Sequence, residues 1–234
     1  MKKALFLHKP KTAGSYVCDR IYKASLLEHN RHVMWLNGWR YRGEDWDYDC
    51  LDSLYHLEIP KAQPIVHVHT VACDTKRFLK FKYNGWFSFM FHREPLDTIA
   101  SALVYISKKN VPLFDQNVLS KQFEGKSVPQ DMSELLRLLV IEEAKLPDVD
   151  RHFPWRLPPY YKNIDWVRKP TEENFIELFD ILNIDYMPCD KINVSDNKGY
   201  QYYRDNGFIN DEIHDTIINM DDFKIQQELW ENIK

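Results

Sequence analysis

The chain has 234 residues, of which 44% are hydrophobic and 28% are charged, and its formal net charge is −4 at pH 7. These totals are ordinary for a globular protein with its own core, and we expect one domain over residues 1–234. The negative charge argues against a general nucleic-acid binder, which needs a broad basic face. An anionic substrate would therefore have to meet a local positive pocket.

No apolar run approaches the ~20 residues that a membrane span needs. The apolar stretch at the start of the chain ends after about four residues, which is shorter than the apolar part of a signal peptide. We therefore expect neither a signal peptide nor a membrane span, and a soluble, cytoplasmic protein. The cysteines have no metal-ligand spacing and are expected to be reduced, partly buried thiols. They are Cys18, Cys50, Cys73 and Cys189.

Apolar runs and helical periodicity alternate along the chain. The predicted strands are 4–7, 32–36, 65–69, 86–91 and 165–167. The predicted helices are 15–28, 74–82, 95–107, 133–145, 171–182, 211–219 and 222–232. Two aromatic segments, 37–49 and 152–161, are interpreted as loops, and 108–131 as an exposed connection. This order predicts an α/β protein with an open parallel sheet and helices on both faces.

Three predicted strands end in polar residues. The first leads into a turn with Lys11, the second ends in His67 and His69, and the third is followed by Arg93. In open parallel sheets, ligands bind at the carboxyl ends of the strands. The order of residues alone therefore predicts that these groups converge at one edge of the sheet.

The first of these turns has the composition of an anion site. Two lysines, two hydroxyl residues, a proline and a glycine lie in 9–15, where a helix is predicted to begin. The free N–H groups and the positive dipole end of that helix would point at the turn, which favours a phosphate or a sulfate. The stretch does not match GxxxxGK[ST], so a nucleoside-triphosphate loop is not predicted. A solvated basic turn of another α/β protein is the alternative.

The stretch Phe6-Leu7-His8-x-Pro10-Lys11-Thr12-Ala13-Gly14-Ser15 resembles the 5′-phosphosulfate loop of the carbohydrate sulfotransferases. These enzymes use 3′-phosphoadenosine 5′-phosphosulfate (PAPS), and they usually have Ile at the position of Lys9. The resemblance implies a P-loop-NTPase-like sulfotransferase fold. It also implies a set of PAPS-binding residues, namely Pro10, Lys11, Thr12, Ala13, Gly14, Ser15 and Tyr16.

The segment after the third strand carries a second resemblance. Arg93-Glu94-Pro95-Leu96-Asp97-x-x-x-Ser101 is similar to the 3′-phosphate motif of PAPS-dependent sulfotransferases. An arginine can hold a phosphate through two parallel charge-assisted hydrogen bonds, and Ser101 can add a donor from the following helix. In the alternative interpretation, Arg93 pairs with a neighbouring carboxylate and Ser101 is a neutral helix residue.

The two histidines of the second strand share one face, because side chains alternate along a strand. His67-x-His69-Thr70-Val71 resembles the His-Gly-His-Val segment of the uronyl 2-O-sulfotransferase branch, whose second histidine is the catalytic base. The resemblance implies that His69 is the base and His67 a supporting residue. Either histidine could instead be a core residue with satisfied hydrogen bonds. A zinc site is a further alternative, but the spacing places no third ligand.

Taken together, the resemblances imply a sulfotransferase that moves a sulfuryl group from PAPS to a hydroxyl, expected to be on a saccharide, and releases 3′-phosphoadenosine 5′-phosphate (PAP). Lys11 and the amides of the first turn would stabilise the 5′-phosphosulfate, His69 would be the general base, and no metal is required. The alternatives are a P-loop-like kinase, which needs a Mg²⁺-binding Asp and a full triphosphate loop, and a non-catalytic nucleotide-binding relative.

Overall fold

The computed structural model describes residues 3–9, 12, 14–27, 33–35, 65–70, 73–109, 157–185 and 199–234. The chain divides into two compact units. Unit 1 comprises Met1–His92, Leu157–Asn193 and Ile233–Lys234, and unit 2 comprises Arg93–Arg156 and Val194–Asn232. The predicted helix 133–145, the loop 37–49, and residues 110–131 and 152–156 lie outside the described residues.

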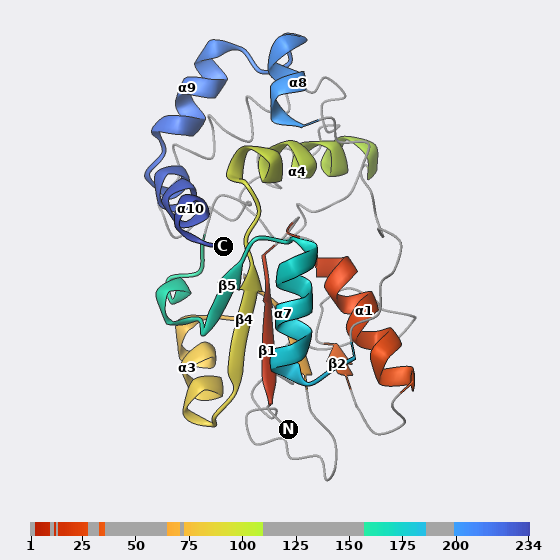
Figure 1. The fold of residues 1–234 in the computed structure, drawn as a ribbon. Coiled ribbons are helices and arrows are strands. Elements are labelled where there is room, and N and C mark those ends of the chain that lie inside the picture. The colour runs from red at the N-terminus through yellow and green to blue at the C-terminus, as the bar shows by residue number, and fades with distance from the viewer. Residues whose placement is uncertain are drawn as a thin grey trace, which may run out of the picture. The chain divides into compact units, whose positions relative to one another are not determined.

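Unit 1 is built on a parallel sheet (Figure 1). Its strands are β1 (Ala4–His8), β2 (Val33–Trp35), β3 (Ile65–His69), β4 (Phe87–Phe91) and β5 (Trp166–Arg168). They lie in the order β2-β3-β1-β4-β5, and every pair is parallel. The predicted α/β class and open parallel sheet are confirmed, and each predicted strand ends within one residue of the observed one.

Both faces of the sheet are covered, which is why its strands are nearly continuous apolar runs. Helices α1 (Gly14–Leu27) and α7 (Glu172–Leu182) lie in front of the sheet in Figure 1. Their apolar side chains form a buried core with one face of the strands. The residues of this core include Phe6, Val17, Ile21, Phe89, Phe91, Phe175 and Phe179. Side chains on the opposite face, such as Leu5, Leu7 and Val68, are fully buried as well.

Two helices of unit 1 are capped at their N-termini by short polar side chains, at the positions where the sequence predicts that these helices begin. Helix α3 (Thr75–Tyr83) starts after Asp74, whose carboxylate accepts the N–H of Arg77 at 2.7 Å. Helix α7 starts after Thr171, whose hydroxyl oxygen accepts the N–H of Asn174 at 3.3 Å. Each side chain satisfies an N–H that has no partner within its helix. A one-turn 3₁₀ helix, η5 (Tyr161–Asn163), precedes β5.

The described part of unit 2 is helical. Its helices are α4 (Pro95–Lys109), α8 (Tyr200–Asp205), α9 (Asp211–Asn219) and α10 (Asp221–Asn232). The predicted helices 95–107, 211–219 and 222–232 are confirmed to within two residues. Helix α8 was not predicted, because six residues are too few to show a helical period. Its first N–H, on Tyr200, donates to the Asp97 carboxylate at 3.3 Å and so ties α8 to the first turn of α4.

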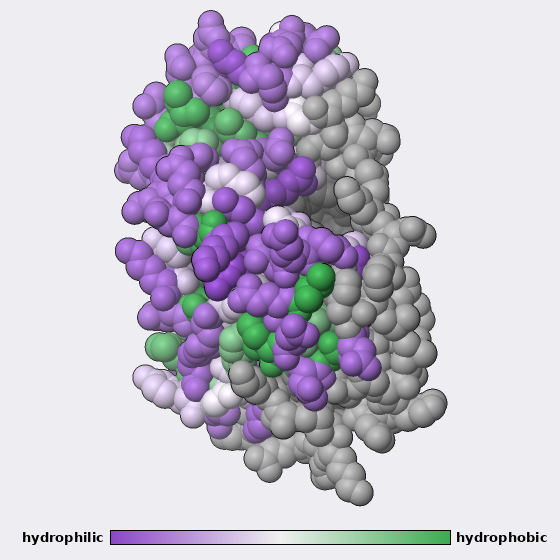
Figure 2. All heavy atoms as spheres, viewed as in Figure 1, coloured by the Kyte–Doolittle hydropathy of each residue, from purple (hydrophilic) through white to green (hydrophobic). Residues whose placement is uncertain are grey.

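The surface of the described residues is mostly hydrophilic in the view of Figure 2, with apolar residues in small groups. The exposed large apolar side chains lie on several helices and turns, and they are Leu79, Tyr83, Ile176, Tyr202, Phe208 and Ile225. None of the helices in the described ranges is long and apolar enough to cross a membrane.

Asp165, which directly precedes β5, is hydrogen-bonded to Ser88 of β4. One of its carboxylate oxygens accepts the N–H and the hydroxyl of the buried Ser88, each at 2.8 Å. The other oxygen pairs with the Lys82 ammonium at the end of α3. Burial acts to raise the pKa of Asp165, but the hydrogen bonds from Lys82 and Ser88 outweigh it and hold this pKa below its ordinary value.

We expect the Asp165→Asn variant to lose about 1–2 kcal/mol of unfolding free energy at neutral pH, because an amide cannot replace the carboxylate for all three donors. The ion-pair part of this loss is small, since the carboxyl is about a third exposed. Because the pKa of Asp165 is lower in the folded than in the unfolded protein, its carboxylate stabilises the fold at pH values above the unfolded-state pKa of about 3.9. This stabilisation is lost as the pH falls through the folded-state pKa. Urea unfolding should therefore show a smaller difference near pH ~3 than near pH ~7. An equal loss at both pH values, or a similar loss in Asp180→Asn on the exposed side of α7, contradicts this role.

Candidate functional site

The sheet order points to the carboxyl ends of β1 and β3 as the place for a ligand. These two strands are neighbours, yet the chain leaves β1 toward β2 on one side and leaves β3 toward β4 on the other. In open parallel sheets, ligands bind outside the strand ends where neighbouring connections run in opposite directions. The candidate site is therefore the edge formed by the last residues of β1 and β3 and by the turn that follows β1.

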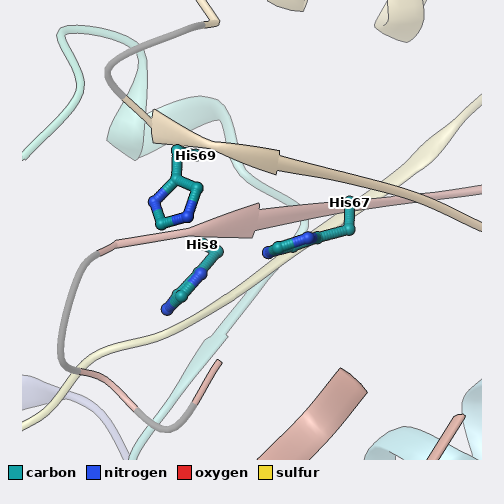
Figure 3. A group of neighbouring side chains, drawn as sticks. All are labelled: His8, His67 and His69. Atoms are coloured by element: carbon teal, nitrogen blue, oxygen red, sulfur yellow. The ribbon is translucent and has the colours of Figure 1, made fainter. Parts of the chain in front are cut away.

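Three histidines occupy this edge. His8, the last residue of β1, lies opposite His69, the last residue of β3, and His67 lies opposite Phe6. The ring centroids of His8 and His69 are 4.5 Å apart, those of His8 and His67 5.1 Å, and those of His67 and His69 5.6 Å. Figure 3 shows the three rings gathered on one side of the two strands. We call this group the histidine cluster.

The rings of His67 and His69 are neutral at neutral pH. Burial, with a smaller contribution from His69, lowers the pKa of His67 to about 3. Burial also lowers the pKa of His69 to about 4. His67 is 3% exposed, whereas His8 and His69 are half-buried. A neutral imidazole has a nitrogen lone pair for a proton or a metal ion, and His69 is not fully buried.

The first residue of α1 must be a glycine, because the His8 ring lies against Gly14 and leaves no room for a side chain. A Cβ atom placed on Gly14 would overlap the ring of His8. The backbone φ of Gly14 is not in the left-handed region, so the requirement is one of space and not of backbone conformation. The absence of a side chain at Gly14 therefore fixes how closely the start of α1 approaches the histidine cluster.

We expect the Gly14→Ala variant to lose about 1–3 kcal/mol of stability, the usual cost of overpacking. In a His8→Ala background the same change should be neutral or stabilising by about 0.5–1 kcal/mol, because alanine is the better helix residue. A double-mutant cycle by denaturant unfolding measures this coupling. If Gly14→Ala costs the same in both backgrounds, the close packing of His8 on Gly14 is wrong.

The turn between β1 and α1 is described only in part. Lys11, Pro10 and Ala13 lie outside the described residues, as does the side chain of Ser15. Thr12 is buried, and its hydroxyl donates to the carbonyl of Lys9 at 2.7 Å. A hydroxyl has a single proton, so that of Thr12 is used within the turn and is not offered to a ligand.

Tyr16, which the resemblance places among the cofactor-binding residues, contacts α7. Its hydroxyl donates to the Glu172 carboxylate at 3.2 Å, and its ring lies 4.7 Å from that of Phe175. The guanidinium of Arg20, a buried residue, lies 3.9 Å from the centre of the Tyr16 ring and 3.8 Å from Glu172. The sequence analysis did not identify Arg20, because its partner comes from a distant helix. This group attaches the start of α1 to the start of α7.

Arg93 and Ser101 belong to unit 2; Arg93 lies two residues before α4 begins, and Ser101 lies in the first half of that helix. The Arg93 guanidinium lies 3.9 Å from the carboxylate of Asp97, and its side chain is 33% exposed. This contact matches the predicted alternative of a local ion pair, but at that distance and exposure it is weak. Ser101 is buried. The histidine cluster and the turn after β1 belong to unit 1.

His8 was not predicted as a member of the site. The sequence pattern pairs His67 with His69, and His8 entered the prediction only as part of the loop pattern. The signal was available in the sequence, since His8 directly follows the predicted strand 4–7, His69 ends the predicted strand 65–69, and parallel neighbours place such ends side by side.

No family profile, curated protein or solved structure that we compared matches this chain. The fold and the geometry of the site therefore carry the functional argument.

Proposed function

We propose that this chain is a PAPS-dependent sulfotransferase with a P-loop-like sulfotransferase fold, acting on a hydroxyl of a saccharide. One observation carries the proposal. The strand–turn–helix segment that resembles the phosphosulfate loop lies beside the half-buried His69, because β1 and β3 pair in parallel with His8 opposite His69. A donor-binding turn and a base must be this near to one another for direct transfer between two bound substrates.

In the proposed reaction, the acceptor oxygen attacks sulfur while its proton passes to a ring nitrogen of His69. The new bond is between the acceptor oxygen and sulfur. The bond that breaks joins sulfur to the bridging oxygen of the 5′-phosphate, and PAP leaves with that oxygen. Lys11 and the N–H groups at the start of α1 stabilise the charge that develops on the leaving phosphate and on the transferring group. His67, a buried residue whose ring centroid lies 5.6 Å from that of His69, is the supporting residue.

In this proposal the 3′-phosphate of PAPS is bound by Arg93, with Ser101 as a second donor. A phosphate offers Arg93 a better partner than the weak contact with Asp97, because it can accept two parallel hydrogen bonds. The acceptor is a hydroxylated saccharide, and nucleic acid is not expected to bind.

Radiolabelled PAPS tests the proposal. The full chain, in buffer with a chelator, is incubated with [³⁵S]PAPS and a panel of saccharide, phenol and lipid-headgroup acceptors. Label transferred to a hydroxyl acceptor, with a preference for saccharides, is the expected result. Binding of PAP without transfer to any acceptor would favour a non-catalytic relative. Phosphate transfer from ATP with Mg²⁺, and none from PAPS, would favour a kinase.

A further inference from the structure

The histidine cluster has the composition and the spacing of a metal site. Each of the three rings offers one nitrogen, and these three atoms all lie within 4.8 Å of one another. They come from the ends of two hydrogen-bonded strands, so the backbone that carries them is held by the sheet. The sequence analysis left zinc as an alternative that lacked a third ligand, and His8 supplies that ligand.

We propose that His8, His67 and His69 bind a divalent transition-metal ion of the Zn²⁺ class, with one coordination position open to solvent. Imidazole nitrogen suits Zn²⁺ and Co²⁺. Three protein ligands with a fourth, open position are typical of zinc sites that are accessible to small molecules. The open position faces the half-buried side of the cluster, at His8 and His69, since His67 is buried.

The distances require only a small rearrangement. Zinc–nitrogen bonds of about 2.0–2.1 Å in tetrahedral geometry place ligand nitrogens about 3.3 Å apart. Nitrogens that are up to 4.8 Å apart can approach to that separation by rotation about side-chain bonds, without a change in the strands.

This inference rests on the geometry of the histidine cluster and not on the proposed sulfotransferase activity, which needs no metal. The two share His69, and a metal ion on its nitrogen would occupy the lone pair that accepts the proton in transfer. The metal is therefore expected to oppose transfer, and a site of this kind would make the enzyme sensitive to zinc.

Cobalt spectroscopy tests the site directly. The full chain is stripped with a chelator, dialysed and titrated with Co²⁺, whose visible absorption bands become intense when it is four-coordinate. We expect one Co²⁺ per chain with such bands. His8→Ala and His69→Ala should each weaken binding by at least about 10–100-fold, the loss that even an outer-shell change typically causes. The matched control is His214→Ala, which removes a histidine of α9 in unit 2 and should leave cobalt binding unchanged.

Wild-type cobalt affinity in His8→Ala, or a wild-type spectrum no different from that of aqueous Co²⁺, would overturn the proposal. If the variants do not fold, NMR of the wild-type protein still tests whether the histidine cluster binds a metal ion. Zn²⁺ must then shift the ring signals of three of the nine histidines, and the proposal is wrong if no ring signal shifts. The titration contains no nucleotide, so cobalt binding without sulfate transfer contradicts the proposed function alone, and the reverse result contradicts the metal site alone.

Discussion

Replacing His69 with glutamine is expected to reduce sulfuryl transfer by about 10²–10⁴-fold, the usual contribution of a positioned general base. Glutamine keeps a polar side chain at the end of β3 but cannot take up the proton of the acceptor hydroxyl. Because the change removes proton transfer and not a phosphate contact, the affinity for PAP should stay close to that of the wild type. Initial rates with labelled PAPS, together with calorimetric titration of PAP, separate the two effects.

The His69→Gln assay needs two controls. A chelator must be present, so that loss of a metal ligand is not mistaken for loss of a base. His214→Gln removes an imidazole that is hydrogen-bonded to Tyr200 in unit 2, and it should transfer sulfate at the wild-type rate. A His69→Gln protein that retains its rate under these conditions would show that another group accepts the proton.

The Lys11→Ala variant is expected to lose about 10²–10³-fold in the rate of transfer, as enzymes do when one well-aimed donor to a developing negative charge is removed. The ammonium would act on the leaving 5′-phosphate and on the transferring group, so the rate should fall more than PAP affinity. Lys76→Ala, which removes an exposed lysine of α3, is the control for net charge. Turnover of PAPS by Lys11→Ala at the wild-type rate would remove Lys11 from the mechanism.

Local patterns predicted the secondary structure well, because each signal lies within a few residues. The alternating strand of 65–69 was predicted with the observed bounds, and Thr171 was identified as the start of its helix. The parallel sheet followed from the alternation of strands and helices. The six-residue α8 was missed, since its start depends on a contact between Tyr200 and Asp97 that is remote in sequence.

The site was predicted less completely, because it depends on which strands pair and in what register. Only the pairing of β1 with β3 reveals that His8 joins His69. Likewise, the hydrogen bond of Tyr16 to Glu172 follows only from the packing of α1 on α7. The close approach of the His8 ring to Gly14 also depends on the fold and is not apparent from the sequence.

The central claim is that this chain binds a nucleotide with phosphates at two positions, and that Arg93 binds its 3′-phosphate. Calorimetric titration of PAP and of adenosine 5′-phosphate, without Mg²⁺, into the wild type and Arg93→Gln tests this claim most directly. The account predicts that Arg93→Gln binds PAP about 10–100-fold more weakly, the value of a lost hydrogen bond to a charged group, and binds adenosine 5′-phosphate as the wild type does. Equal PAP affinity in the two proteins, or no PAP binding by the wild type, would contradict it.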